Sequence, residues 1–310
     1  MKAVVCTRYG PPDVLELAEI EEPVPQPDEV RVKVHATAVT SSDCLVRGFR
    51  LPRSKWIQAR LALGLTKPRQ PVLGMVLAGE IDAVGSAVTD FQVGDRVYGL
   101  DRERFGAYAA YKCMPQDGIL APEPASLDHV RAAAIPYGGL LAMHLLRKGG
   151  IAFHHKVLVY GASGAVGTAT VQLAKHFGAE VTGVCGPKHL GLVEALGADT
   201  VIDYTAGDFL PRGVQYDIII IAVGDRVGPP SPARCRAALA PHGAYVAIDH
   251  GTPQFHAADL ILLGQLTAEA QLRPIIDRRY TLDQIVEAHR YVDLGHEAGT
   301  VVLTVTDTAD

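Results

Sequence analysis

The chain has 310 residues, of which 48% are hydrophobic, so it is long enough to bury the cores of two domains of ordinary size. Its formal net charge of -5 provides no general positive field for phosphate backbones or anionic lipids, which argues against nucleic acid and membrane partners. The N-terminal residues run directly into a strand-like pattern without the apolar stretch of a signal peptide, so a cytoplasmic location is expected.

Strand-like patterns fill the first part of the chain. Residues 2–10 and 14–20 are followed by a proline-rich linker and by residues 30–39, in which apolar and polar side chains alternate strictly. Residues 75–100 continue in the same way, with glycines at turn-like intervals. These segments predict a β-rich domain.

A basic segment, residues 49–70, interrupts the strands. It contains Arg53, Lys55 and Arg60 and could form one short helix. Because charged faces usually face water, we favour a solvated surface excursion over a lid that closes on substrate.

The apolar period becomes helical from about Ala125, which marks a domain boundary. Ser126 is the predicted N-cap of a helix over residues 127–135, and a second helix over residues 140–149 ends at Gly149. Strands and helices then alternate through residues 156–161, 165–178, 180–186, 189–197, 200–204, 216–224, 231–243 and 244–249. Helices at 258–270 and 282–295 and a strand at 299–305 complete the pattern.

The alternating part of the chain indicates its fold class. Strands without a polar face must be covered on both sides, which predicts a doubly wound parallel sheet of the Rossmann type. The sequence therefore predicts an α/β fold in which this sheet is joined to the β-rich N-terminal part.

One glycine-rich turn carries the clearest chemical signal. It supplies strand, turn and helix in the order that a dinucleotide site requires, with free N–H groups and a positive dipole at the start of the helix. Glycines allow a tight turn, close approach of a pyrophosphate and close packing of helix on strand. We therefore predict dinucleotide binding rather than a merely structural turn. The predicted cofactor-binding residues of the turn are Gly161, Ala162, Ser163, Gly164, Ala165, Val166 and Gly167.

The residues after the next strand favour NADPH over NADH. An Asp or Glu there would bind the ribose 2′-hydroxyl of NAD, but this chain has Gly186, Pro187 and Lys188. A cation favours a 2′-phosphate, and we favour this role for Lys188 over that of a solvated surface lysine. Tyr204 could add a hydroxyl to the same phosphate, with surface exposure an equal alternative. Val223 is also predicted to contact the cofactor.

Motifs along nearly the whole chain resemble the quinone oxidoreductase-like group of the medium-chain dehydrogenase/reductase superfamily. They are MKAVV, YGPPDVLEL, LGMVLAGEIDAVG, FQVGDRVYG, AAAIPYGG, LGADTVIDY and IVEAHRYVDLGHEAG. The resemblance implies a GroES-like catalytic domain formed by residues 1–124 and 256–310. It also implies a Rossmann domain at residues 125–255, with the active site in the cleft between the two.

No metal site is predicted. Zinc members of the superfamily carry a catalytic Cys and His at positions that here hold Thr40 and Met75, and their four-cysteine zinc lobe is missing. The five cysteines are scattered, without a C-x-x-C pair, and are expected to be reduced thiols.

The resemblance implies hydride transfer from NADPH to a quinone or an α,β-unsaturated carbonyl, including an enoyl group. Thr40, where the family often has Asn, and Tyr137 are the candidate catalytic residues, although a packing role for Tyr137 is an equal alternative. Leu141 replaces a Thr that commonly lies near the cofactor, so a polar contact is expected to be lost. An NADPH-binding sensor or interaction protein with little catalytic activity is the alternative hypothesis.

The stretch between residues 252 and 258 is short for the family. Relatives carry a further strand here that pairs with its copy in a second subunit. The resemblance therefore implies a monomer or an atypical dimer.

Overall fold

The computed structural model describes residues 1–51, 56–224, 228 and 230–305. The chain forms two compact units, each of which is described by itself. The first unit comprises residues 1–136, 276–294 and 300–310, and the second comprises residues 137–275 and 295–299.

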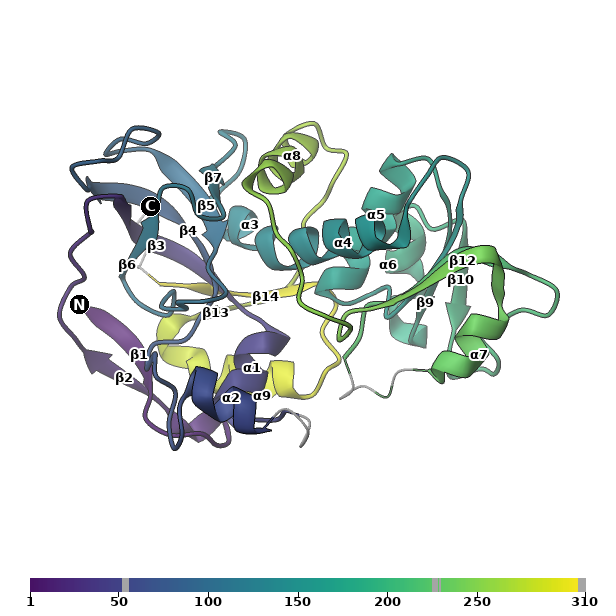
Figure 1. Ribbon diagram of the computed structural model, residues 1–310, viewed down its shortest axis with the longest axis horizontal. Helices are drawn as coiled ribbons and strands as arrows, with labels where there is room; N and C mark the ends of the chain where they lie inside the picture. The colour runs from purple at the N-terminus through teal and green to yellow at the C-terminus, as the bar shows by residue number, and fades with distance from the viewer. Residues whose placement is uncertain (52–55, 225–227, 229, 306–310) are drawn as a thin grey trace. The chain divides into compact units, whose positions relative to one another are not determined.

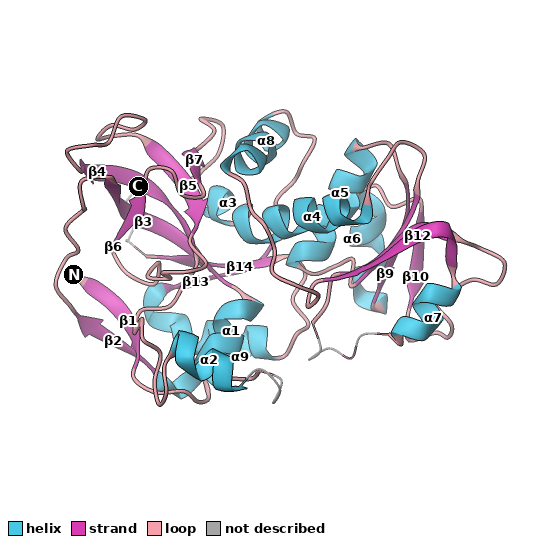
Figure 2. Ribbon diagram, viewed as in Figure 1, coloured by secondary structure: helices cyan, strands magenta, loops and turns pink. Residues whose placement is uncertain are grey.

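The first unit is built on a seven-stranded mixed sheet, whose strands Figure 2 shows in magenta. The strand order is β13-β14-β3-β4-β5-β7, with β6 paired to β3, and a separate antiparallel pair is formed by β1 and β2. The strands are β1 (Lys2–Cys6), β2 (Leu15–Glu19), β3 (Glu29–Val39), β4 (Val76–Val84), β5 (Arg96–Leu100), β6 (Tyr111–Pro115), β7 (Leu120–Pro122), β13 (Ile276–Thr281) and β14 (Thr300–Thr304).

The strict alternation in β3 decides which face of this sheet is buried. Val30, Val32 and Val34 are fully buried and pack with Leu77 and Ile81 of β4. Alternate side chains of a strand point to opposite faces, so the predicted pattern places these valines in one core. The prediction of a β-rich N-terminal part is confirmed.

The helices of the first unit are short. They are η1 (Pro12–Val14), α1 (Ser41–Gly48), α2 (Trp56–Leu63), α3 (His129–Ala133), η5 (Leu282–Gln284) and α9 (Ile285–Asp293). The basic segment does contain one short helix, α2, while Arg53 and Lys55 lie outside the described residues.

The predicted N-cap Ser126 is wrong. The side chain of Asp128 accepts the backbone N–H of Arg131, so α3 begins at His129. The backbone N–H of Leu127 donates to the carbonyl of Pro124, and this turn keeps Ser126 outside the helix. Ser126 and Asp128 both have side chains that can cap a helix, and the turn at residues 124–127 leaves Asp128 at the N-cap position.

The second unit holds a five-stranded parallel sheet with the order β10-β9-β8-β11-β12, of which Figure 1 labels β9, β10 and β12. Helices follow β8, β9 and β11, while the described residues 204–215 lead from β10 to β11 without one, and the parallel order confirms the α/β prediction of a Rossmann-type sheet. The strands are β8 (Lys156–Tyr160), β9 (Glu180–Cys185), β10 (Thr200–Asp203), β11 (Tyr216–Ile221) and β12 (Leu239–Ala247). The helices are α4 (Pro136–Gly149), α5 (Ala165–His176), η3 (Pro187–His189), α6 (Leu190–Ala195), α7 (Pro232–Ala237) and α8 (Ala257–Ala268).

The boundaries between the two units differ from the predicted domain boundaries. Residues 125–136 cluster with the first unit, where α3 packs against β3, β4 and β14. Residues 256–275 cluster with the second unit, where Asp259 of α8 pairs with Arg147 of α4 at 2.6 Å. The limits of the GroES-like and Rossmann domains, at residues 124/125 and 255/256, stay predictions.

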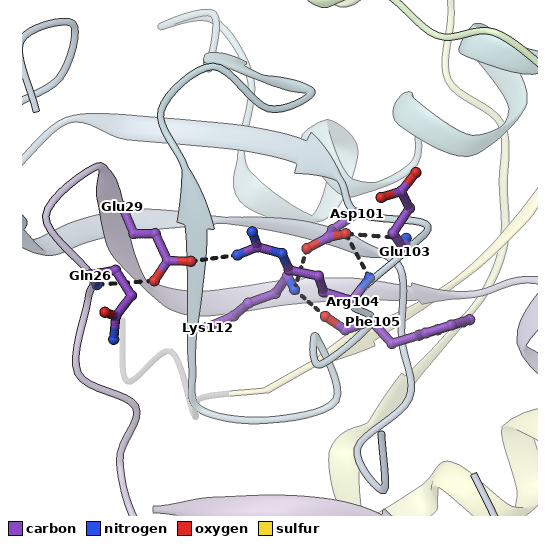
Figure 3. A network of polar contacts seen from close by, with 7 residues as sticks. All are labelled: Gln26, Glu29, Asp101, Glu103, Arg104, Phe105 and Lys112. Carbon is purple, nitrogen blue, oxygen red and sulfur yellow. Dashed lines mark hydrogen bonds and ion pairs between the residues drawn. The ribbon is translucent and has the colours of Figure 1, made fainter. Parts of the chain in front are cut away.

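A polar network fixes the loop between β5 and β6 in the first unit (Figure 3). The buried ammonium of Lys112 pairs with Asp101 at 2.8 Å and donates to the carbonyl of Phe105. Asp101 also accepts the backbone N–H of Arg104, whose guanidinium pairs with Glu29. Burial lowers the pKa of Lys112, and the charge of Asp101 opposes that shift. Two ion pairs and the backbone hydrogen bond of Arg104 thus hold the loop to β3 and β6.

In the described part of the chain, no helix combines the length and the apolar character needed to cross a bilayer.

Candidate functional site

The turn between β8 and α5 requires glycine at two positions. Gly161 has a φ of +82°, and a Cβ built on it would lie 2.3 Å from Cγ1 of Val223. A Cβ on Gly167 would lie 2.0 Å from the carbonyl oxygen of Gly161. Such distances are too short for any real side chain, so the backbone folds back on itself only because these residues are glycines.

The turn is also closed by backbone hydrogen bonds within the second unit. The N–H groups of Gly161 and Ala162 both donate to the carbonyl of Val184, at 2.9 and 3.0 Å. The N–H of Gly299 donates to the carbonyl of Ser163 at 2.8 Å, and a bridge joins Gly299 to Gly164. The peptide groups of the turn are therefore held in fixed orientations.

Helix α5 begins directly at this turn. Gly164 is its N-cap and has no side chain that could accept the first N–H groups of the helix. The N-terminus of a 12-residue helix without a side-chain cap presents N–H donors and a positive dipole to an anion. The seven predicted residues from Gly161 to Gly167 thus form one continuous turn that leads into the first turn of α5.

Lys188 and Tyr204 follow neighbouring strands, β9 and β10, at the carboxyl end of the parallel sheet. Asp203, the last residue of β10, pairs with Cys185, the last residue of β9, so the segments that follow both strands start side by side. A Cβ on Gly186 would lie 3.7 Å from the Tyr204 hydroxyl, and both Lys188 and Tyr204 are exposed. Ligands of open parallel sheets usually bind beyond the carboxyl ends of the strands, which is where both residues lie.

Tyr137 lies at the start of α4, close to the turn. The next residue, Gly138, has a Cβ position only 2.3 Å from the carbonyl oxygen of Ala165, so the first turn of α4 packs against the first turn of α5. Tyr137 and Leu141 are both buried. The predicted catalytic residue Thr40 belongs to the other unit and is described separately.

Thr40 is the N-cap of α1 and forms a capping box with Asp43. Its hydroxyl accepts the backbone N–H of Asp43 at 3.1 Å and donates to the Asp43 carboxylate at 2.6 Å. Burial raises the pKa of Asp43 to about 6, and hydrogen bonds from Thr40, Tyr108 and Gly74 oppose the shift. The hydroxyl proton of Thr40 is therefore engaged by Asp43 at neutral pH, which orients the side chain.

A buried polar cluster in the first unit has no counterpart in the sequence analysis. Arg47 is fully buried and pairs with Asp293 at 2.6 Å, while its Nε and Nη1 have no partner among the described residues. The Sγ of Cys44 lies 3.3 Å from Nδ1 of His289, whose ring meets Tyr108 edge-on. The contact joins α1 to α9. Cys44 and His289 are 245 residues apart in the chain, so no spacing pattern in the sequence could indicate that they meet.

The cluster predicts a pH dependence of folding. Burial lowers the pKa of His289 from 6.5 to about 3, with the charge of Arg47 adding to the shift and Asp293 opposing it. A lowered histidine pKa means that the unfolded chain binds an extra proton between these values, so stability from His289 is lost as the pH falls below about 6.5.

We expect His289→Gln to weaken the dependence of the free energy of unfolding on pH below about 6.5. The wild-type free energy of unfolding should fall more steeply between pH 6.5 and 4, by up to about 1.4 kcal/mol per pH unit. Urea unfolding across this range measures the difference. Asp43 acts in the opposite sense, because a raised carboxyl pKa makes its contribution fall as the pH rises through about 6. Equal slopes for both proteins would assign the acid sensitivity to other groups.

Among the residues that the structure describes, no group of three or more His, Cys, Asp or Glu side chains is arranged to hold a metal ion. Thr40 and Met75, at the positions of the catalytic Cys and His of zinc relatives, are both buried.

Family profiles match most of the chain. The profile described as an alcohol dehydrogenase GroES-like domain matches residues 26–124. Two profiles described as zinc-binding dehydrogenase match residues 165–274 and 250–303.

A reductase, an oxidoreductase and one solved structure are similar to nearly the full length of this chain. The 2-methylene-furan-3-one reductase of Solanum lycopersicum is 30% identical over 323 residues, covering 98% of this chain and 79% of the relative. The NADPH-dependent alkenal/one oxidoreductase of Arabidopsis thaliana chloroplasts is 29% identical with the same coverage. The solved structure of the quinone oxidoreductase from Coxiella burnetii superposes with a TM-score of 0.86 at 27% identity, covering 99% of each chain.

Proposed function

This chain belongs to the quinone oxidoreductase-like group of the medium-chain dehydrogenase/reductase superfamily, and we propose that it reduces quinones or α,β-unsaturated carbonyls with NADPH. It is an oxidoreductase that uses a nicotinamide cofactor. The preference for NADPH, the class of acceptor and independence from zinc are our proposals.

The glycine turn is the observation that carries the proposal. When bound, the cofactor supplies the hydride, and the chain has to hold its phosphates and orient its ring. The missing Cβ atoms of Gly161 and Gly167 and the uncapped start of α5 suit a pyrophosphate. Lys188 and Tyr204 would hold the 2′-phosphate. Val223, whose side chain covers Gly161, would line the same turn.

The acceptor class rests on the relatives, two of which are named for the reduction of conjugated carbonyls. Thr40 and Tyr137 are the proposed catalytic residues. The Thr40 hydroxyl donates to Asp43 and can only accept a further hydrogen bond, so its proposed partner is the amide group of the nicotinamide, while the Tyr137 phenol is the proposed donor to the carbonyl of the acceptor. Neither Thr40 nor Met75 offers a thiolate or an imidazole, so we propose chemistry without zinc.

The first experiment is titration of the protein with NADPH and NADH, followed by assays of NADPH oxidation with quinones and enones in the presence of EDTA. Tighter NADPH binding and turnover that resists EDTA are expected. Tight NADPH binding without turnover on a broad acceptor panel would favour a sensor or interaction protein, as the engaged Thr40 hydroxyl and Leu141 suggest. Light scattering tests the expected monomer or atypical dimer.

Lys188→Ala tests the phosphate site. We expect NADPH affinity to fall by roughly 10-fold to 100-fold, the usual value of a hydrogen bond to a charged group, while NADH affinity stays unchanged. Fluorescence titration with both cofactors measures the ratio. The matched control is Lys33→Ala, which removes an exposed lysine from β3 in the other unit. An equal loss for both cofactors, or none, would refute the assignment.

A further inference from the structure

Helix α2 and the turn after it carry an exposed apolar surface (α2 in Figure 1). We call this surface, formed by Trp56, Ile57, Leu61 and Leu65, the α2 patch. Ile57 is 81% exposed, Leu65 69% and Leu61 62%, and no residue of α2 is buried. Several large apolar side chains exposed within ten residues usually mark an interaction site, since water is a poor solvent for them.

The α2 patch is held in place rather than left loose. The guanidinium of Arg60 stacks on the Phe49 ring at 3.8 Å and on the Tyr9 ring at 4.9 Å. The indole N–H of Trp56 donates to the carbonyl of Leu51 at 2.8 Å. The Tyr9 hydroxyl donates to the carbonyl of Gly64 at 3.0 Å, which fixes the turn that leads to Leu65. One side of the helix is thus anchored, and Ile57 and Leu61 remain turned to the solvent.

The charged residues of the chain segment that carries the patch have one sign. Between Asp43 and Glu80 the chain contains no acidic residue, although the protein as a whole is acidic. Lys67 and Arg69 follow the patch, are exposed, and form no ion pair with any described residue. Apolar side chains with a Trp and flanking cations are the composition of segments that lie in a membrane interface.

We propose that the α2 patch docks on the surface of a bilayer that contains anionic lipids. Ile57, Leu61 and Leu65 would enter the acyl boundary, and Lys67 and Arg69 would contact lipid phosphates. The net charge of the chain predicts no membrane partner, but attraction to a lipid surface depends on charges within about 10 Å of it. A second copy is the poorer occupant, because a symmetric contact would bring the cations of both copies together.

Sedimentation of the full chain with vesicles tests this proposal independently of any reductase activity. We expect binding to phosphatidylcholine mixed with phosphatidylglycerol, weak binding to phosphatidylcholine alone, and weaker binding at high salt. The Ile57→Ser/Leu61→Ser variant should lose at least about tenfold in the partition coefficient. Lys67→Gln/Arg69→Gln should lose about tenfold and most of the salt dependence.

The matched control is Val24→Ser/Leu294→Ser, which removes two other apolar side chains that are 76% and 65% exposed. It should bind vesicles like the wild type, and thermal melting should show that all variants fold. Equal binding by the patch variant and the control would overturn the proposal. So would a patch variant that keeps its lipid binding but changes its oligomeric state or its KM for water-soluble acceptors, because the patch would then serve a second copy or the substrate.

Discussion

Gly167→Ala should lower the affinity for NADPH by at least about tenfold and the stability by about 1–3 kcal/mol. The new methyl group would lie 2.0 Å from the carbonyl oxygen of Gly161 and 2.7 Å from Cα of Ala162. Both neighbours are backbone atoms and cannot rotate away. The turn itself has to move, and with it the N–H groups at the start of α5 that we assign to the pyrophosphate.

Gly191→Ala is the matched control for this change. Gly191 lies in α6 of the same unit, and a Cβ on it would meet nothing within 4 Å. Alanine should therefore raise stability by up to about 1 kcal/mol through helix propensity, with no change in affinity. Cofactor fluorescence and thermal unfolding give the two readouts. A Gly167→Ala protein that is destabilised but binds NADPH normally would show that the turn serves packing and not the cofactor.

Asp293→Ala should destabilise the chain by about 3–5 kcal/mol, the usual cost of leaving a buried charge without its partner. Arg47 is fully buried, its Nη2 bonds to Asp293 at 2.6 Å, and its other guanidinium nitrogens have no partner among the described residues. Removal of Asp293 leaves a desolvated cation in a site that already contains the neutral ring of His289. Urea unfolding at neutral pH measures the loss.

Two further variants identify the cause of that loss. Arg47→Met/Asp293→Ala should recover much of the stability, because an apolar side chain of similar length replaces the orphaned charge. Glu180→Ala, which breaks the exposed Lys156–Glu180 pair, should cost about 0–1 kcal/mol. If the double variant were as unstable as Asp293→Ala, lost packing rather than the buried charge would be responsible.

The sequence alone was sufficient where periodicity is strong. The alternation in β3, the apolar runs of β8 and β11 and the helical period of α5 all have one interpretation, and their order defines a doubly wound sheet. The cofactor turn could be located in the same way, because its glycines follow a strand and precede a helix.

Other features depend on tertiary contacts that no local pattern contains. β13, Ile276–Thr281, carries charged residues and is only half-buried, and it forms because β14 offers a parallel partner. The Thr40 hydroxyl donates to the carboxylate of Asp43, and the complete burial of that carboxylate depends on tertiary packing. Arg47 looks like an ordinary helix cation in the sequence, and its burial follows from the packing of α1 against α9.

The place of β14 in the seven-stranded sheet has a consequence for synthesis. This strand, Thr300–Thr304, lies between β13 and β3, yet it is among the last residues to be made. At the usual rate of about 5–20 residues per second, the end of β3, residues 36–39, waits many seconds for its partner strand during synthesis. The second unit, by contrast, has all its strands by residue 247 and can assemble first. Nascent chains should therefore acquire the parallel sheet of the second unit before the seven-stranded sheet of the first unit is complete, and chaperones have their longest opportunity to act on the earliest-made strands.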